Sequence, residues 1–365
     1  MTANAATTEL KPPALEQGVL GWARANLFNS PFSALLTVLA VWLLLATVPG
    51  LVEWAFINAT WTAADSKVCK AAANGACWAF VWEKHRLMLF GLYPFAEQWR
   101  PMLAVVVFVA LIVVSCMRSF WRPSLGLIWL AGLAINSTLM WGGVLGLTFV
   151  ENEKWGGLPL TLILSTFGIV FAFPLGIMLA LGRRSNMPAI KALCVVYIEL
   201  IRGVPLVSLL FMASVMLPLF LPTGMNFDKL LRAQIAIIMF AAAYLAEVIR
   251  GGLQALPKGQ YEAADALGLS YWQKTGLVIL PQALKLVIPP LVNTFIGMFK
   301  DTSLVVIIGL FDLLNSVKAS LVDPAWPGFS REGYIAVSLI YFVFCYSMSK
   351  YSQALEARLA TGHKR

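Results

Sequence analysis

The sequence predicts an all-α polytopic membrane protein with about eight transmembrane helices. Three observations support this fold class: 59% of the 365 residues are hydrophobic, only 12% are charged, and the apolar residues collect in long segments. Soluble domains contain about 45–50% apolar and about 25% charged residues, whereas a spanning helix needs about 20 mostly apolar residues. The net charge of +9 fits the excess of Lys and Arg in the cytoplasmic loops of membrane proteins. No basic patch is interleaved with aromatic residues, so a nucleic-acid partner is not expected.

The N-terminal part is predicted to be an added membrane module. Residues 1–30 form a polar cytoplasmic tail without the cleavage-site pattern of a removable signal peptide. A three-helix extension is expected at residues 31–150, because its segments contain no expected buried charge and no proline-broken helix, and a membrane core is expected at residues 151–365. The spans of the extension are expected at residues 32–51, 101–116 and 123–150, with a polar, tryptophan-containing loop at residues 52–100.

Five more spans are expected after a boundary near residues 151–157. They are predicted at residues 158–181, 188–221, 233–249, 276–298 and 334–348. A straight helix over the second of these would be about 50 Å long at about 1.5 Å per residue, against a hydrocarbon core of about 30 Å. Gly203 and Pro205 therefore predict a kink between a slanted entry helix and the span. Pro289 and Pro290 predict a similar break in the span at residues 276–298, the seventh of the chain. Broken helices are tolerated where they are buried in protein or line a cavity.

Lys and Arg residues in short loops indicate which side faces the cytoplasm. These basic residues are Arg118 and Arg122, Arg183 and Arg184, Lys258 and Lys274, and those of the C-terminal LEARLATGHKR. With eight spans, all of them fall on one side of the membrane. Both termini and the loop at residues 251–275 are therefore expected in the cytoplasm, and residues 52–100 and 301–332 are expected outside.

Two of the five cysteines lie in the polar loop that is expected outside. Cys69 and Cys77 flank the sequence KAAANGA, in which Asn74 and Gly75 are a turn signal. In an exported loop a disulfide could close a small hairpin here, and two unpaired thiols are the open alternative. The other cysteines lie in or beside apolar runs and are expected to be small buried hydrophobic residues.

A cytoplasmic segment rich in small residues, KGQYEAADALGLSYWQKTGLVILPQAL, runs from Lys258 to Leu284. Pro257 suits the first turn of a helix, Glu262 suits the positive end of the helix dipole, and Gly268 suits a helix end. The pattern predicts a short helix lined with alanine that faces water between two apolar spans.

This short helix is expected to dock on a partner. Ala263 and Leu267 are four residues apart and share one face, and Ser270 can cap a second helix that carries Tyr271 and Trp272. The alternative is an interfacial helix that lies on lipid. That alternative accounts for the two aromatic residues but not for the small ones, which offer little apolar area, so docking in a groove is the favoured hypothesis.

Ionisable residues within apolar segments are costly and indicate function. Glu199 and Arg202 are three residues apart in the fifth segment, and Glu247 and Arg250 repeat that spacing in the sixth. Each pair could simply be a local ion pair on one helix face. The functional alternative is that one pair lines a translocation path or an inner gate.

The cytoplasmic segment also carries a family resemblance. Glu262, Ala263 and Ala264, followed by Gly268 and then by the run Val278–Pro281, resemble the EAA loop of ABC-importer permeases, which usually has Ile where Val278 stands. The stretches YIELIRGVPLVSLLF, AYLAEVIRGGLQALPKGQYEAADALG, LPQALKLVIPPLVN and KDTSLVVIIGLFDLL are similar to the polar amino-acid subfamily. The resemblance covers about residues 156–358. The extension before it resembles the larger permease subunit of proteobacterial general L-amino-acid uptake systems.

The resemblance implies a type I ABC-importer permease in the bacterial inner membrane. It implies a five-helix core that pairs with a second homologous permease subunit, two cytoplasmic ABC ATPase subunits and a periplasmic amino-acid-binding protein. The ATPase-coupling residues that it implies are Glu262, Ala263, Ala264, Leu267 and Gly268. The chain has no G-x-x-x-x-G-K-[ST] phosphate loop, so ATP and Mg²⁺ are expected on the partner ATPase and no cofactor is expected in this chain.

Four residues, two deep in the seventh of the eight expected spans and two near its outer end, could contact the transported molecule. Asn293 and Thr294 follow the double proline, and Lys300 and Asp301 come one to two turns later. A zwitterionic amino acid needs an acceptor for its ammonium group and donors for its carboxylate. Lys300 and Asp301 could instead cap helices and form an interfacial ion pair.

Enzymatic functions are not supported by the sequence. The two histidines, His85 and His363, lie in the outer loop and the C-terminal tail, and no Cys/His cluster has metal-ligand spacing. An ion-driven secondary transporter is the alternative function, since broken helices occur there as well, but it would leave the docking segment without a role. A membrane scaffold without a transport role is a third hypothesis, and it would leave Glu199 and Arg202 without a role.

Overall fold

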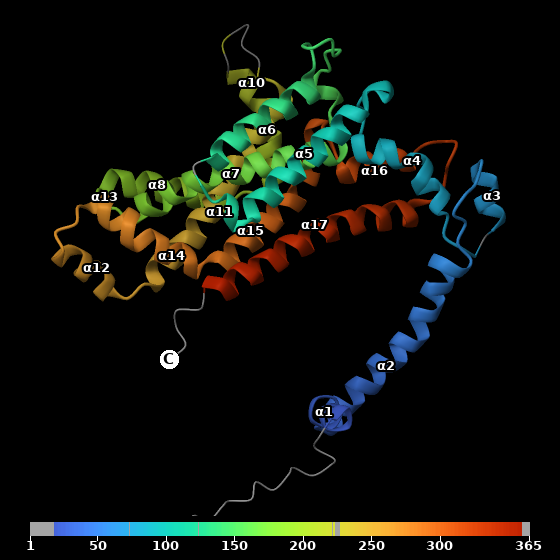
Figure 1. Cartoon of the computed structure of the whole chain (residues 1–365), viewed down its shortest axis with the longest axis horizontal. Helices are drawn as coiled ribbons and strands as arrows, with labels where there is room; N and C mark the ends of the chain where they lie inside the picture. The colour runs from blue at the N-terminus through green and yellow to red at the C-terminus, as the bar shows by residue number, and fades with distance from the viewer. Residues whose placement is uncertain (1–17, 73, 123, 221, 223–226, 360–365) are drawn as a thin grey trace, which may run out of the picture. The chain divides into compact units, whose positions relative to one another are not determined.

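The computed structural model describes residues 18–359, apart from residues 73, 123, 221 and 223–226. Most of the expected N-terminal tail, the expected last residue of the fifth span and His363 lie outside the described residues. The chain divides into two compact units, residues 1–79 and 80–365, which are drawn in Figure 1. The extension expected at residues 31–150 is thus shared between both units, and its boundary near residues 151–157 stays a prediction.

The first unit contains one long apolar helix and a small cross-linked loop. Helix α1 (Gly18–Asn26) precedes α2 (Pro31–Val52), which begins with Ser30 as its N-cap and continues as a π-helical turn (Glu53–Ile57). Within this unit none of the side chains of α2 is buried. In the loop, Cys69 of α3 (Ser66–Ala71) forms a disulfide with Cys77.

The second unit begins with helices that were expected to belong to the extension. These are α4 (Trp78–Phe90, which starts in the first unit), a 3₁₀ turn (Phe95–Glu97), α5 (Trp99–Cys116), a 3₁₀ turn (Arg118–Phe120) and α6 (Ser124–Trp141). Helix α5 packs against both α6 and α7 (Gly157–Arg183). Helices α5 and α6 are therefore part of the same packed bundle as the later spans.

The third span is shorter than predicted, and the extension does contain a buried charge. Helix α6 ends at Trp141 instead of reaching residue 150, because Gly142 adopts a φ of +69°. Arg100 of α5 is completely buried and donates hydrogen bonds to the carbonyl oxygens of Leu139, at 2.7 Å, and Thr148, at 2.9 Å. The long side chain of Arg100 thus satisfies backbone acceptors at and after the end of α6. A search for apolar runs does not detect this role, because the acceptors lie far from Arg100 in the sequence.

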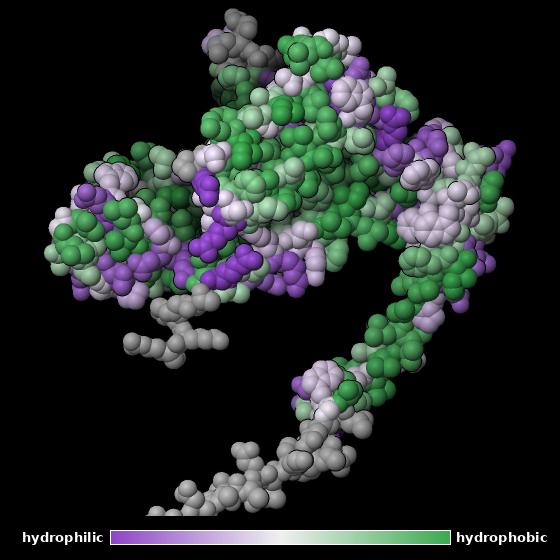
Figure 2. Space-filling view, in the orientation of Figure 1, coloured by the Kyte–Doolittle hydropathy of each residue, from purple (hydrophilic) through white to green (hydrophobic). Residues whose placement is uncertain are grey.

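The remaining elements of the second unit form the core that follows the extension. After a 3₁₀ turn (Asn152–Lys154) they are α7, α8 (Pro188–Arg202), α9 (Leu206–Phe211), a π-helical turn (Met212–Met216), α10 (Leu217–Phe220), α11 (Lys229–Ala255), α12 (Lys258–Ala266), α13 (Tyr271–Gln273), a π-helical turn (Lys274–Ile279), α14 (Leu280–Leu286), α15 (Ile288–Asp301), a 3₁₀ segment (Thr302–Ile308), β1 (Phe311–Asp312), α16 (Leu313–Leu321) and α17 (Ser330–Leu359). Apolar side chains cover much of the surface of this bundle (Figure 2).

Among the described residues, seven helices are long and apolar enough to cross a membrane, and eight if a bent pair counts as one span. The bent pair joins α8 to α9–α10 with an angle of 103°. The bend falls at Gly203–Pro205, where the kink was predicted, because Pro205 has no N–H group to continue the hydrogen bonding of α8. The prediction of about eight spans is confirmed when the bent pair is counted as one span.

The break predicted at the double proline lies earlier than expected. Helix α14 ends at Leu286, Val287 lies outside both helices, and Pro289 and Pro290 stand in the first turn of α15. Proline is well tolerated in a first turn, because the N–H group that it lacks has no partner within the helix there. The two prolines therefore start a helix instead of interrupting one.

Helices α7 and α11 pack together along their length through small residues. Four small residues on α7, each four positions after the last, are all buried: Gly168, Ala172, Gly176 and Ala180. Gly176 approaches the backbone of Ala242 and Ala246 on α11, which are also buried, and Gly168 approaches Ile237 of α11. A small residue at every fourth position allows two spanning helices to approach closely. We call this contact the α7–α11 seam.

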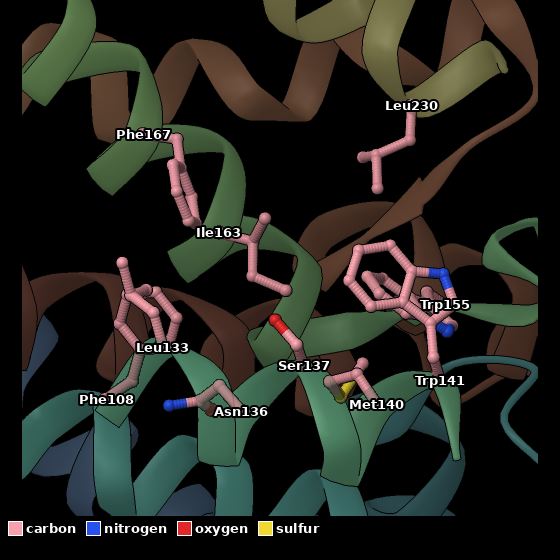
Figure 3. A pocket seen from close by; sticks show the side chains of 10 residues that line it. All are labelled: Phe108, Leu133, Asn136, Ser137, Met140, Trp141, Trp155, Ile163, Phe167 and Leu230. Carbon is pink, nitrogen blue, oxygen red and sulfur yellow. The ribbon is translucent and has the colours of Figure 1, made fainter. Parts of the chain in front are cut away.

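A cavity of about 100 Å³ lies beside the seam, among α5, α6, α7 and α11. Figure 3 shows its aromatic and aliphatic lining, with Phe108 and Phe167 at one side and Trp141 and Trp155 at the other. Asn136 of α6 also lines it, and within the described residues its side-chain oxygen has no hydrogen-bond partner. The helices of the extension therefore pack less tightly on the core than α7 packs on α11.

Gly176→Ala is expected to lower the stability of the protein. A Cβ atom at this position would lie 2.9 Å from the Cβ atom of Leu245 and 3.3 Å from the carbonyl oxygen of Ala242. Overpacking of this kind costs about 1–3 kcal/mol, which outweighs the gain of about 1 kcal/mol from replacing a helical glycine. Thermal unfolding of the purified protein in detergent measures the effect.

Gly297→Ala is the matched control, because a Cβ atom at Gly297 of α15 would meet nothing within 4 Å. This variant is expected to be as stable as the wild type or slightly more stable. Equal melting temperatures for the two variants would contradict close packing at the seam.

Candidate functional site

The first candidate site is the pair of short helices α12 and α13, which lies at one end of the second unit, far from α16 (Figure 1). Gly268 follows the last turn of α12 with a φ of +70°. Its N–H donates to the carbonyl oxygen of Asp265 at 2.9 Å, and the N–H of Leu269 donates to that of Ala264 at 3.2 Å. This pair of bonds is the Schellman motif, in which glycine is favoured because other residues are strained at positive φ. The predicted role of Gly268 as a helix end is confirmed.

The start of α12 differs from the prediction. Pro257 has a ψ of 140° and precedes the first helical residue, Lys258. Glu262 consequently lies in the middle of the helix, outside the first turn where the helix dipole would favour it. An extended conformation at Pro257 separates α12 from the end of α11, so the direction of the chain changes before α12 begins.

The predicted coupling residues fall on different sides of α12. Ala263 and Leu267 share an exposed face, and the side chain of Leu267 is 78% exposed. Glu262 is also exposed, whereas Ala264 is only 2% exposed and packs against the rest of the chain. We call the exposed side chains of Ala263, Leu267 and, on α13, Trp272 the docking face. Ala264 positions this face from beneath.

Polar contacts define the local conformation of α13 and link α12 to the residue that follows α13. Lys274 and Asp265 form an ion pair at 2.5 Å, and Ser270 and Gln273 form a reciprocal capping box at the start of α13. The predicted capping role of Ser270 is thus confirmed. The docking face is presented by a segment with a defined local conformation.

The second candidate site is a group of five charged residues where α7, α8 and α11 meet. Arg183 Nη1 lies 2.8 Å from Glu199 Oε1 and 2.8 Å from Glu247 Oε1. Glu247 also contacts Arg250 at 2.7 Å and Arg202 at 3.5 Å. The Arg183 contacts lack hydrogen-bond alignment, so they are ion pairs held by charge. We call these five residues the charge cluster.

The charge cluster differs from the local pairs that were expected. Glu247 and Arg250 do pair on one helix, but Glu199 pairs with Arg183 of α7 and Arg202 pairs with Glu247 of α11. Arg183 was interpreted only as a topology signal, because a basic residue after an apolar run is typical of a cytoplasmic end. Three guanidinium groups against two carboxylates leave one surplus positive charge at this end of the bundle.

The four residues suggested for substrate contact lie along or at the end of α15. Thr294 donates its hydroxyl to the carbonyl oxygen of Pro290 at 3.0 Å, and Asn293 and Lys300 are exposed. Asp301 is the last residue of α15. In the described chain, no hydrogen bond or ion pair connects these residues to one another or to the charge cluster, so their suggested role stays a prediction.

A buried polar group around Asp312 was not detected from the sequence. Asp312 is completely buried, caps α16 through the N–H groups of Leu314 and Asn315, and accepts a hydrogen bond from the Tyr341 hydroxyl of α17 at 3.0 Å. The N–H of Leu313 donates to the Thr161 hydroxyl of α7 at 3.0 Å. Burial raises the pKa of the Asp312 carboxyl above its usual value, although the N–H groups of Asn315 and the Tyr341 hydroxyl lower it in part. This group joins α16 to two spans.

Comparison with known proteins identifies the chain. The family described as "Binding-protein-dependent transport system inner membrane component" matches residues 172–361. The chain belongs to this family. The match includes the charge cluster, α12, α13 and Asp312, and it confirms the predicted resemblance to ABC-importer permeases.

Individual relatives resemble the chain over nearly its whole length. The inner membrane amino-acid ABC transporter permease protein YhdY of Escherichia coli (strain K12) is 53% identical over 347 residues, which cover 93% of each chain. The glutamate/glutamine/aspartate/asparagine transport system permease protein BztC of Rhodobacter capsulatus is 41% identical and covers 96% of each chain. A solved structure described as an amino acid ABC transporter with histidines is 35% identical over 55% of this chain and 92% of its own, with a TM-score of 0.49.

Membership of this family makes the chain a multi-span permease subunit of an inner-membrane ABC transporter. The ion-driven secondary transporter and the membrane scaffold are not supported, because the family works in binding-protein-dependent transport systems. Both YhdY and BztC extend over the first three predicted spans. The extension is therefore shared with these relatives.

Glu247→Gln is expected to destabilise the permease far more than Glu199→Gln. Glu247 is 14% exposed and contacts three guanidinium groups, whereas Glu199 is 56% exposed and contacts one. Removing one partner from a largely buried ion pair costs about 3–5 kcal/mol, and an exposed pair contributes about 0–1 kcal/mol. Thermal unfolding in detergent compares the two variants, which remove the same charge. Equal effects would contradict the central position of Glu247.

Asp312 is expected to make the protein more stable at low pH than at higher pH. A carboxyl whose pKa is raised by folding binds protons more strongly in the native state, so stability falls as the pH rises from about 3.8 through the raised value. The melting temperature of the wild type should therefore decrease over this range more than that of Asp312→Asn, which cannot ionise. Parallel pH profiles for the two proteins would rule out this contribution.

Proposed function

We propose that this permease subunit moves polar amino acids from a periplasmic binding protein into the cytoplasm, driven by ATP hydrolysis that reaches it through α12 and α13. The substrate class is supported by the relatives, whose names specify amino-acid transport. The coupling role is supported by one structural observation above all. The exposed apolar side chains of the docking face lie on two short, capped helices at the end of the bundle that carries the charge cluster.

The docking face fits the groove of a separate protein better than it fits lipid. Leu267 caps the end of α12 and Trp272 lies on α13, and the exposed residues near them include Glu262 and Asp265 of α12. Two apolar anchors surrounded by polar residues are typical of a protein interface with a small hydrophobic centre. A helix that lies on lipid needs a broad apolar face instead, and the alanines of α12 do not provide one.

The proposed partners follow from this function. They are a second homologous permease subunit, two cytoplasmic ABC ATPases that bind ATP and Mg²⁺, and a periplasmic amino-acid-binding protein. The positive-inside rule supports a cytoplasmic position for both termini and for α12, since Arg183, Arg184 and Lys258 are close to the same end of the bundle. The chain itself then acts without a cofactor.

The charge cluster is proposed as an inner gate of the permease. Its five residues come from three helices, so their ion pairs hold α7, α8 and α11 together at the end nearest α12. The bend between α8 and α9 directly follows Arg202. A movement of these helix ends would separate the ion pairs and expose the surplus positive charge, which attracts the carboxylate of an amino acid.

Leu267→Glu is expected to weaken binding of the ATPase subunits at least about tenfold, which corresponds to about 1.4 kcal/mol. The new carboxylate would be buried against an apolar groove without a partner. The measurement is the amount of ATPase that co-purifies with the permease, together with uptake by liposomes that contain the whole complex. Both should fall together.

Val322→Glu is the matched control. Val322 is 79% exposed, almost the same as Leu267, but it follows α16 at the other end of the second unit. This variant should retain the ATPase subunits at the wild-type level. If Leu267→Glu also retained them and still supported uptake, the docking face would not be the coupling surface.

A further inference from the structure

Arg183 and Arg184, two consecutive residues at the end of α7, contact different parts of the molecule. Arg183 belongs to the charge cluster. The Arg184 guanidinium instead reaches the short helix α12, where its Nη1 donates a hydrogen bond to the Tyr261 hydroxyl at 3.0 Å. The guanidinium carbon also lies over the Tyr261 ring, 5.5 Å from the ring centroid. The end of α7 therefore lies between the charge cluster and α12.

Tyr261 has a central place among the contacts of α12. Its hydroxyl accepts from Arg184 and donates to the carbonyl oxygen of Leu253 on α11 at 2.9 Å. One hydroxyl group therefore joins α7, α11 and α12. The residues around this contact also line an open hollow of about 400 Å³, which includes Arg184, Leu256 and Lys258. The hollow leaves α12 with little other packing on this side.

Covalent geometry links the Arg184 contact to the charge cluster. A displacement of Arg184 also displaces Arg183, because consecutive Cα atoms are about 3.8 Å apart across a planar peptide. Arg183 Nη1 contacts Glu199 of α8 and Glu247 of α11 at the same distance of 2.8 Å. A small movement at α12 can therefore change the ion pairs between three spans.

We propose that the contact between Arg184 and Tyr261, which we call the clasp, transmits the movement of α12 to the charge cluster. The two residues are positioning residues, because they act on the cluster and contact neither ATP nor the transported molecule. This inference rests on the proposed coupling function of α12. It adds the route by which a force on the docking face reaches the gate.

A second polar contact of α12 distinguishes the clasp from a simple tether. Gln282 of α14 donates to the side-chain oxygen of Gln260 at 3.0 Å. Gln260 is next to Tyr261 in the chain, but within the described residues Gln282 has no hydrogen bond to the charge cluster, and its other hydrogen bond goes to the carbonyl oxygen of Val278. If α12 needs only to be held in place, loss of either contact should have the same effect. If the clasp transmits movement, only loss of the Arg184 contact should uncouple the transporter.

The test uses the complete transporter, with its partner subunits, in liposomes. The variants are Tyr261→Phe, which keeps the ring and removes the hydroxyl, and Arg184→Gln, which removes the charge. Each is expected to keep co-purification of the ATPase within about twofold of the wild type. Uptake of an amino acid per ATP hydrolysed is expected to fall at least about fivefold in each. Arg184→Lys, which retains a cationic donor, should recover part of that ratio.

The double variant and the control complete the design. Tyr261→Phe combined with Arg184→Gln should be no worse than Tyr261→Phe alone, because loss of the hydroxyl already removes the hydrogen bond that Arg184 makes. Gln282→Leu should leave the ratio of uptake to hydrolysis unchanged. The clasp is overturned if the single variants keep the normal ratio, if their effects multiply in the double variant, or if Gln282→Leu lowers the ratio equally.

Failure of the clasp can be separated from failure of the proposed function. If the proposed function is wrong, Leu267→Glu retains the ATPase and supports uptake. If only the clasp is wrong, Leu267→Glu loses the ATPase while Tyr261→Phe and Arg184→Gln remain fully coupled. The two results come from different variants and different measurements, co-purification in one case and uptake per ATP in the other.

Discussion

The close approach of α7 and α11 is the constraint on which the rest of the core depends. Membrane helices gain no hydrophobic driving force against lipid, so their association relies on close van der Waals contact. The alternation of Gly168, Ala172, Gly176 and Ala180 provides that contact on α7, and alanines provide it on α11. Both helices end on the same side, where Arg183 meets Glu247 at 2.8 Å. The seam thus fixes the position of the charge cluster.

The charge cluster requires the seam because a largely buried charge needs partners. Glu247 is mostly buried and would be costly to ionise alone, so it is surrounded by three guanidinium groups. One of these comes from α8, whose bend at Gly203–Pro205 brings Arg202 to the end of the seam. The kink and the cluster are therefore parts of one arrangement. A straight fifth span would place Arg202 and Glu199 elsewhere.

Features that depend on local backbone chemistry could be predicted from the sequence. The bend at Pro205, the end of α12 at Gly268 and the cap at Ser270 each follow from the conformation that one residue type favours. Features that depend on partners distant in sequence could not be predicted. Arg183, Arg100 and Asp312 each look ordinary in the sequence, and their partners lie on other helices. The period-four pattern of small residues on α7 is a sequence signal, but apolar content alone does not reveal it.

The short helix α12 can transmit force because both of its ends are conformationally fixed. A flexible loop would absorb a displacement through rotation of its backbone dihedral angles. Here Pro257 has a ring-restricted φ, and Gly268 closes the helix with two hydrogen bonds, so neither end rotates freely. The ion pair between Asp265 and Lys274 then links α12 to the π-helical turn that follows α13. A push on Leu267 must therefore move the whole segment, and the Tyr261 hydroxyl is the point where that segment meets α7.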